Sequence, residues 1–127
     1  MLNVIIERGL YDHDFVNNWC YGFDKLAERV KEYTPDRVEK ITWVPKEDII
    51  RAAELYATSK PASLQSHLGV SMSYNSLQAS RALSILVAIT GNLDVKGGAE
   101  LPNYPIKLTY MNIKKQLRLD KEVEKKL

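Results

Sequence analysis

The chain has 127 residues, of which 45% are hydrophobic and 27% are charged, and this balance indicates one ordinary globular domain. Its longest uncharged apolar run, Leu83 to Ile89, is far shorter than the roughly 20 residues that cross a membrane, so we expect no membrane association. The first residues lack the features of a signal peptide, and we expect a cytoplasmic location for the chain as given. A lone cysteine, Cys20, excludes an intramolecular disulfide and a cysteine-ligated cluster.

The net charge of +2 is unevenly distributed. Residues 114–127 carry six basic and three acidic side chains, which leaves twelve basic and thirteen acidic side chains for the first 113 residues. A nucleic-acid-binding domain concentrates Lys and Arg on one folded face. The nearly neutral body of this chain therefore argues against a nucleic-acid partner.

The first third of the chain predicts short helices. Apolar residues recur at helical spacing from Leu2 to Leu10. Asp12 is suited to cap the next turn, and Gly22 interrupts it. A further helix is expected to open at Asp24.

Two prolines indicate the next two helices, because proline is favoured at the first helical position. The first helix is expected from Pro35 to Ile41 and the second from Pro45 to Thr58. In the second, Glu47 and Asp48 lie in the first turn, where acidic side chains complement the helix dipole.

The middle of the chain predicts a strand, a loop and a helix. The strand is expected from Ala62 to Val70 and the helix from Leu77 to Thr90, with Asn75 or Ser76 as its cap and Gly91 after its end. The helix is apolar nearly all round, which is typical of a helix covered on several faces. A last, solvated helix is expected from Asn112 to Leu127.

The small-residue loop between this strand and helix is a candidate anion-binding site. Backbone N–H groups and the helix dipole at such a loop favour phosphate or pyrophosphate. Gly69 would permit close approach, while Ser71, Ser73 and Ser76 offer hydroxyl donors. No glycine-rich phosphate motif is present, so an ordinary connection between strand and helix is the alternative.

Other polar residues carry two interpretations each. His67 would hydrogen-bond a ligand beside the loop, or would be a satisfied strand residue. The Gly97-Gly98 pair would let backbone approach a ligand, or would form a plain turn. His13 and Cys20 lack neighbouring ligands or an activating base, so we expect neither a metal site nor a catalytic residue in this chain.

Five segments, taken in order and spacing, resemble the molybdopterin oxidoreductases of the dimethyl-sulfoxide-reductase superfamily. They include the Gly-Leu-Tyr-Asp run at residues 9–12 and the Thr-Gly-Asn-Leu run at residues 90–93. Ser76 and Asp94 depart from the pattern, since many relatives have glycine at both positions. The matching segments are Val4 to Val16, Tyr21 to Leu26, Tyr33 to Pro45, Ile49 to Tyr56 and Arg81 to Gly98.

The resemblance implies a fold and a cofactor. The chain would be an interior piece of a large catalytic subunit, in which a molybdenum or tungsten ion lies between two molybdopterin guanine dinucleotides. Its fold would be α/β, a partial Rossmann-like domain that is rich in helices and has few parallel strands. Residues 1–98 would form the domain piece, and residues 99–127 an irregular segment with a basic helical tail.

The same resemblance implies site residues and partners. Arg81 is expected to hold its helix in place, and the remaining domains of the catalytic subunit are the expected partners. Most relatives also carry an iron–sulfur cluster and a metal-ligating residue that this chain lacks, so we expect it to be inactive alone. The alternative is a non-catalytic interaction domain that self-associates through an exposed sheet edge. The expected cofactor contacts are His67, Gly69, Ser71, Ser73 and Asn75.

Overall fold

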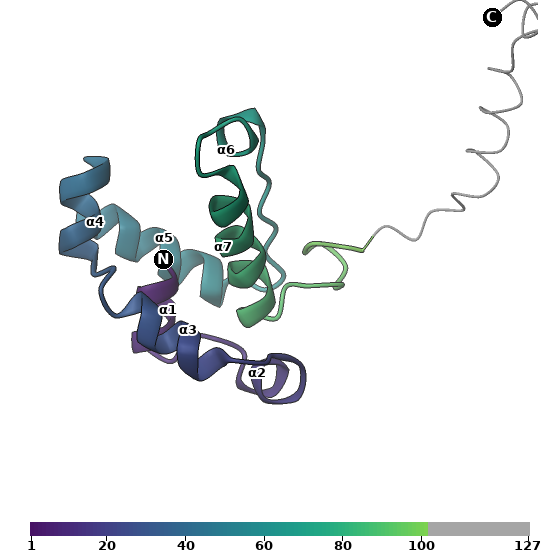
Figure 1. The fold of residues 1–127 in the computed structure, drawn as a ribbon. Coiled ribbons are helices and arrows are strands. Elements are labelled where there is room, and N and C mark those ends of the chain that lie inside the picture. Colours follow the sequence, from purple (N-terminus) through teal and green to yellow (C-terminus); the bar gives the residue numbers. More distant parts are fainter. Residues whose placement is uncertain (102–127) are drawn as a thin grey trace, which may run out of the picture.

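The structure, a computed structural model, describes residues 1–101, which form seven helices joined by short turns (Figure 1). At the two ends of α7 lie α6 and the segment of residues 90–101. The tail helix expected at residues 112–127 lies outside the described residues. The helices are α1 Leu2–Glu7, α2 His13–Trp19, α3 Phe23–Val30, α4 Pro35–Thr42, α5 Lys46–Thr58, α6 Leu68–Ser71 and α7 Ser76–Ile89.

Capping residues and a glycine mark the beginnings of α2, α3 and α4, as the sequence predicts. The Asp12 side chain caps α2, because its Oδ1 accepts a hydrogen bond of 2.8 Å from the Phe15 N–H. That bond, with Lys60 Nζ 3.3 Å from Oδ2, lowers the pKa of the Asp12 carboxyl. Thr34 caps α4 in the same way, and Gly22 precedes α3 with a φ of +77°.

The strand predicted from Ala62 to Val70 is wrong. Residues 62–67 have no regular secondary structure, and α6 begins at Leu68. A strand is stabilised by hydrogen bonds to a neighbouring strand, and residues 1–101 contain none; their one β feature is an isolated parallel bridge between Leu93 and Ala99. The Rossmann-like α/β fold stays a prediction.

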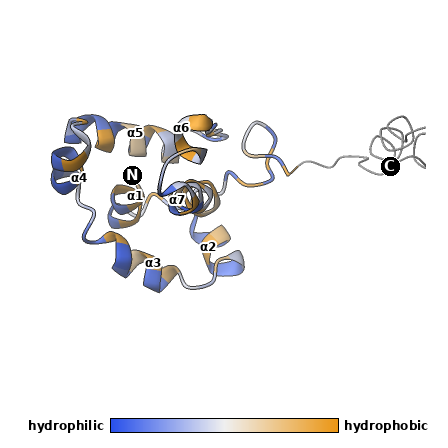
Figure 2. Cartoon of the chain, turned by 45° about the horizontal axis from the view of Figure 1, so that its top comes forward, coloured by the Kyte–Doolittle hydropathy of each residue, from blue (hydrophilic) through white to orange (hydrophobic). Residues whose placement is uncertain are grey.

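The core forms between α1, α2, α5 and α7. In this core α1 packs against α5 and α3, and α2 packs against α7 (Figure 2). Ile5 and Ala53 are fully buried, and an ion pair between Arg8 and Glu54 joins α1 to α5 at the surface. No helix in the described part of the chain has the length and hydropathy to cross a bilayer. The buried cluster consists of Val4, Ile5, Val16, Ala53, Ala57, Leu86 and Ile89.

Three segments meet at the carboxyl end of α7, at the buried side chain of Asn92. Its Nδ2 donates to Thr90 Oγ1 over 2.9 Å, and its Oδ1 accepts from the Ala62 N–H over 3.0 Å. Its carbonyl accepts from the Ala99 N–H over 2.8 Å, while the Asp12 N–H bonds to Ile89 O over 2.7 Å. We call this set of contacts the Asn92 junction.

Glycines make the Asn92 junction possible. Gly91 has a φ of +68°, and a Cβ there would lie 2.4 Å from Asp12 Oδ2. A Cβ at Gly98 would lie 2.5 Å from the Asn92 carbonyl oxygen. Because backbone occupies that space, the fold accounts for Gly98 as part of a turn, without a ligand.

Replacing Asn92 with alanine removes both side-chain hydrogen bonds and leaves the Ala62 N–H without its partner. We expect the free energy of unfolding to fall by about 2–3 kcal/mol, measured by chemical denaturation. Asn17→Ala, on the exposed side of α2, is the control and should change it by less than about 0.5 kcal/mol. Equal effects of the two substitutions would contradict the role of the Asn92 junction.

Substitutions at Gly9 and Gly91 distinguish the cost of backbone strain from the cost of steric crowding. Gly9 has a φ of +63° with open space around its Cβ position, whereas Gly91 has a similar φ and faces Asp12. Gly9→Ala should cost about 1 kcal/mol of stability, and Gly91→Ala should cost at least about 1 kcal/mol more. Thermal and denaturant unfolding measure both values, and a Gly91→Ala variant no less stable than Gly9→Ala would refute the close packing on Asp12.

Candidate functional site

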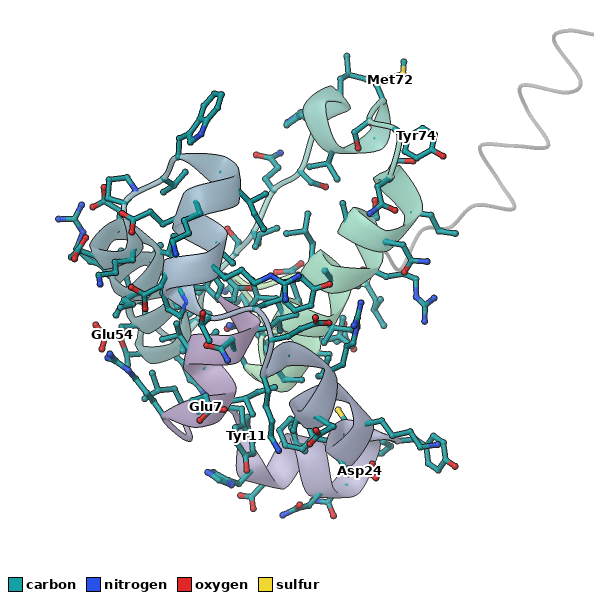
Figure 3. All side chains as sticks on the ribbon, turned by 60° about the vertical axis from the view of Figure 1, so that its left-hand side comes forward. Glu7, Tyr11, Asp24, Glu54, Met72 and Tyr74 are labelled. Atoms are coloured by element: carbon teal, nitrogen blue, oxygen red, sulfur yellow. The ribbon has the colours of Figure 1, made fainter. Side chains whose placement is uncertain are left out.

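The five predicted contact residues lie together on one short stretch at the amino end of α7. We call residues 62–76, which include α6, the α6 segment. It begins at the Asn92 junction, where the Ala62 N–H bonds to Asn92, and runs alongside α7 to α6 at the opposite end of that helix (Figure 1). Figure 3 shows Met72 and Tyr74 projecting away from the helices on this segment. The structure thus brings the predicted residues into one exposed neighbourhood.

Each of the five residues is exposed, and their polar groups differ in availability. His67 precedes α6 in extended conformation, with φ −131° and ψ −165°. Ser71 ends α6, and its hydroxyl makes no hydrogen bond to a described residue, whereas Ser73 Oγ donates to Val70 O over 2.9 Å. Asn75 occupies the cap position of α7 without a side-chain cap hydrogen bond. Several donors on the α6 segment therefore remain available to a ligand.

Gly69 has no local reason to be glycine. It lies inside α6, and a Cβ built there meets no described atom within 4 Å. Glycine within a helix is less favourable than alanine by about 0.5–1 kcal/mol. At Gly91 and Gly98 neighbouring atoms of the fold exclude a side chain, whereas at Gly69 they do not. If Gly69 must be glycine, the requirement therefore comes from a molecule or domain that binds the segment from outside.

The α6 segment belongs to a stretch without charges. Residues 61–80 contain no Asp, Glu, Lys or Arg, although 27% of the whole chain is charged. Lys60 and Arg81 lie at its two borders. The sequence alone reveals this feature, but a motif does not, because the feature is an absence of charged residues. No carboxylate within the stretch would repel an anionic ligand.

Large apolar side chains on and beside the α6 segment are also exposed. Leu68 is 67% exposed, Met72 80% and Leu77 69%, and Tyr74 is fully exposed. Figure 2 shows this hydrophobic character at α6, in contrast to the hydrophilic surfaces of α3 and α4. Contiguous exposed apolar side chains mark interaction surfaces. The described residues leave this surface uncovered.

The contacts of His13, Cys20 and Arg81 give none of them a role in binding or catalysis. The Tyr11 ring lies 4.2 Å from the His13 ring, centroid to centroid, and Cys20 is partly buried against the core. Arg81 is exposed and makes no ion pair with a described residue, so no contact in residues 1–101 supports its expected structural role. In the same residues, no group of three His, Cys, Asp or Glu side chains is placed to hold a metal ion.

A shallow hollow lies on α7 beside the turn that follows it, and its lining is almost wholly apolar. Its one polar side chain, Ser84, donates its hydroxyl to the Ser80 carbonyl, and no lining side chain is ionisable. Its lining residues are Ser84, Ile85, Val87, Ala88, Leu93 and Ala99.

The hydroxyls of the α6 segment and of the Asn92 junction should differ in their effect on stability. Ser71→Ala should leave the free energy of unfolding within about 0.5 kcal/mol of its original value, because its hydroxyl is exposed. Thr90→Val keeps the shape of a fully buried side chain and leaves Asn92 Nδ2 unpaired, so it should cost about 1–3 kcal/mol. Denaturant unfolding of both variants compares them, and equal costs would contradict this division.

Comparison with known proteins gives a consistent set of relatives. No protein-family model matches the chain. The chain is 46% identical over 105 residues to an acetylene hydratase of Syntrophotalea acetylenica, a match that covers 83% of this chain. It is 41% identical to the alpha subunit of an F420-dependent formate dehydrogenase of Methanocaldococcus jannaschii, over 76% of this chain. It is also 41% identical to formate dehydrogenase H of Escherichia coli, over 73% of this chain.

A solved structure of an acetylene hydratase is similar to the fold of this chain. The acetylene hydratase from Pelobacter acetylenicus superimposes with a TM-score of 0.70 and 48% sequence identity over 71% of this chain. The match covers 12% of that protein. Among the relatives in sequence, the chain spans 14% of the acetylene hydratase and of the archaeal formate dehydrogenase subunit, and 13% of the bacterial enzyme.

Proposed function

Because the chain belongs to the molybdopterin oxidoreductase superfamily, we propose that it is a piece of a molybdenum or tungsten enzyme and that its α6 segment contributes to the binding site of a molybdopterin guanine dinucleotide. The proposed contacts are His67, Gly69, Ser71, Ser73 and Asn75, all exposed on this segment.

The donor set of the α6 segment fits an anionic dinucleotide. Its polar groups are a histidine, hydroxyls, an amide and backbone N–H groups, and no acidic side chain lies between residues 61 and 80. The first N–H groups of α7 lack partners within the helix and add a partial positive charge. Neutral donors and a helix dipole suit a pyrophosphate. Ser71 and Asn75 have the polar groups most available for such contacts.

Gly69 is the observation on which this proposal chiefly rests. The fold of residues 1–101 leaves room for a side chain there. A ligand that packs against the α6 backbone would explain why none is present, since only glycine lets another group come so close.

In this proposal the chain binds and orients the cofactor, and it does not react. The metal held by the pterins supplies the chemistry at the reacting centre. The polar groups of the α6 segment fix the dinucleotide end, and no described residue acts as a base, nucleophile or metal ligand in our account. Substrate selection would depend on parts of the enzyme beyond the segment that these 127 residues match.

A place within a larger catalytic subunit would also explain the expected α/β fold class and the exposed apolar side chains. Residues 62–67 are drawn out alongside α7 and lead into it through α6 (Figure 1). In an α/β domain such a connection leads into a helix that covers the sheet. We infer that the remaining domains of the catalytic subunit supply the strands of that sheet and cover Leu68, Met72, Tyr74 and Leu77.

Isothermal titration of the 127-residue chain with guanosine diphosphate tests the proposed site. We expect saturable binding, and we expect Gly69→Val to raise the dissociation constant at least about tenfold, a change of about 1.4 kcal/mol. Because the fold tolerates a side chain at Gly69, the variant should unfold at the original temperature.

Ala52→Val is the matched control, since it also adds bulk at an exposed helical position, on α5. It should bind the nucleotide as tightly as the original chain. Absence of saturable binding, or equal binding by the Gly69→Val and Ala52→Val variants, would contradict the proposed site.

A further inference from the structure

We propose that Asp12 and Lys60 form a proton-controlled latch, which holds residues 60–62, where the chain enters the α6 segment, against the start of α2 and the carboxyl end of α7. The latch is the ion pair between Asp12 Oδ2 and Lys60 Nζ, 3.3 Å apart, and it opens when the Asp12 carboxyl takes up a proton. Every contact of the latch lies within residues 1–101, and the inference is independent of the proposed cofactor.

Asp12 is held in place by contacts other than Lys60. Its Oδ1 accepts from the Phe15 N–H at the start of α2, and its own N–H donates to Ile89 O at the end of α7. The Gly91 backbone lies against the carboxyl group, since a Cβ built there would be 2.4 Å from Oδ2. One oxygen is therefore committed to the helix cap, and the other is placed to accept from Lys60.

This prior fixing of Asp12 distinguishes the latch from an ordinary surface ion pair. Two mobile side chains lose conformational entropy when they pair at a surface, and most such pairs contribute little to stability. The Asp12 side chain is 30% exposed and already fixed, so only the Lys60 side chain, 49% exposed, has to be ordered. The pair therefore restrains Lys60 at a smaller cost in entropy.

Lys60 is the first of three consecutive residues that contact the rest of the fold. The Pro61 ring lies against Gly97, where a built Cβ would be 3.1 Å from Pro61 Cγ. The Ala62 N–H bonds to Asn92 Oδ1 over 3.0 Å. Because the three residues are joined directly, release of Lys60 allows the next two to move more freely. The Ala62 amide should therefore respond to the charge on Asp12.

Lys60 is the charged side chain that pairs with the Asp12 carboxyl. The end of α7 contributes none, because residues 82–93 contain no ionisable side chain. In the first turn of α2, Asp14 contributes its backbone N–H, and the His13 ring lies against Tyr11. In the turn after α7, the carboxylates of Asp94 and Glu100 accept from backbone N–H groups of that turn.

The pH at which the latch opens follows from the pKa of Asp12. The Phe15 N–H, and then Lys60, lower the pKa of this carboxyl below its ordinary value. Because the pKa is lower in the folded chain than in the unfolded one, the stabilisation is complete above about pH 4. It is lost as the pH falls through the lowered value. The latch is thus closed near neutral pH and opens in acid.

Amide hydrogen exchange, followed by NMR at about pH 6, tests the latch through charge removal. Asp12→Asn keeps the cap, because Asn and Asp cap helices about equally well, and it removes the charge that holds Lys60. We expect the Ala62 amide to exchange at least about threefold faster, while the Phe15 amide stays within about twofold of its original rate. Lys60→Gln should have the same effect, and the double variant should exchange no faster than either single variant.

The pH profile tests the role of the proton. In the original chain, protection of the Ala62 amide, corrected for the intrinsic exchange rate, should fall together with the titration of the Asp12 carboxyl below about pH 4. In Asp12→Asn it should not change with pH over the range in which helical circular dichroism is constant. In Lys60→Gln the pKa of Asp12 should be higher than in the original chain.

Asp36→Asn is the matched control, because Asp36 Oδ1 also pairs with a lysine, Lys46 Nζ, over 2.7 Å, and its pKa is lowered by that lysine. This change removes an equal charge from the contact between α4 and α5 and should leave the Ala62 amide unaffected. An unchanged Ala62 exchange rate in Asp12→Asn, an equal acceleration in Asp36→Asn, or the original pH profile in Asp12→Asn would each overturn the proposal.

Discussion

The buried amide of Asn92 is the interaction on which this arrangement depends. It lies at the carboxyl end of α7 and joins the start of the α6 segment, at Ala62, to Thr90 of the following turn. Its backbone carbonyl holds the returning chain at Ala99. A buried amide without these partners would cost free energy, so the three segments are bound to one another as a unit. This contact fixes where the α6 segment begins, and α6 itself packs against α7.

The two ends of α7 consequently have different roles. The carboxyl end is closed: its carbonyl groups are paired, and Thr90 and Asn92 are buried. A side chain at Gly91 would collide with the Asp12 side chain, and one at Gly98 would collide with the Asn92 backbone. The amino end is open: Leu77 is exposed, and the adjoining α6 segment carries free donors and no charge. The Thr-Gly-Asn-Leu run shared with the superfamily maps to the closed end, where it is structural. The proposed ligand and partner contacts map to the open end.

The sequence predicts the helices well because local interactions determine where they begin. Asp12 and Thr34 cap helices through hydrogen bonds to residues three positions further along, and such signals require no knowledge of the rest of the fold. The strand predicted from Ala62 to Val70 is wrong, because no local signal decides whether a strand finds a partner. The burial alternates only from Ala62 to Gln65, α6 begins at Leu68, and the described residues include no neighbouring strand.

The sequence also predicts some features of the candidate site and not others. Its residues are close in sequence, so their grouping at the amino end of α7 follows once that helix is predicted. The role of Asn92 could not be predicted, because its partner Ala62 lies 30 residues away. The distinction between Gly69, which the fold leaves free, and Gly91, which it requires, also needs three-dimensional contacts.

Amide hydrogen exchange at Ala62, followed residue by residue by NMR, tests the anchoring of the α6 segment most directly. In the original chain this amide should be protected, because it bonds to the buried Oδ1 of Asn92. In the Asn92→Ala variant it should exchange at least about tenfold faster under conditions where the helices remain folded. An Ala62 amide that exchanges at the same rate in both proteins would contradict the account.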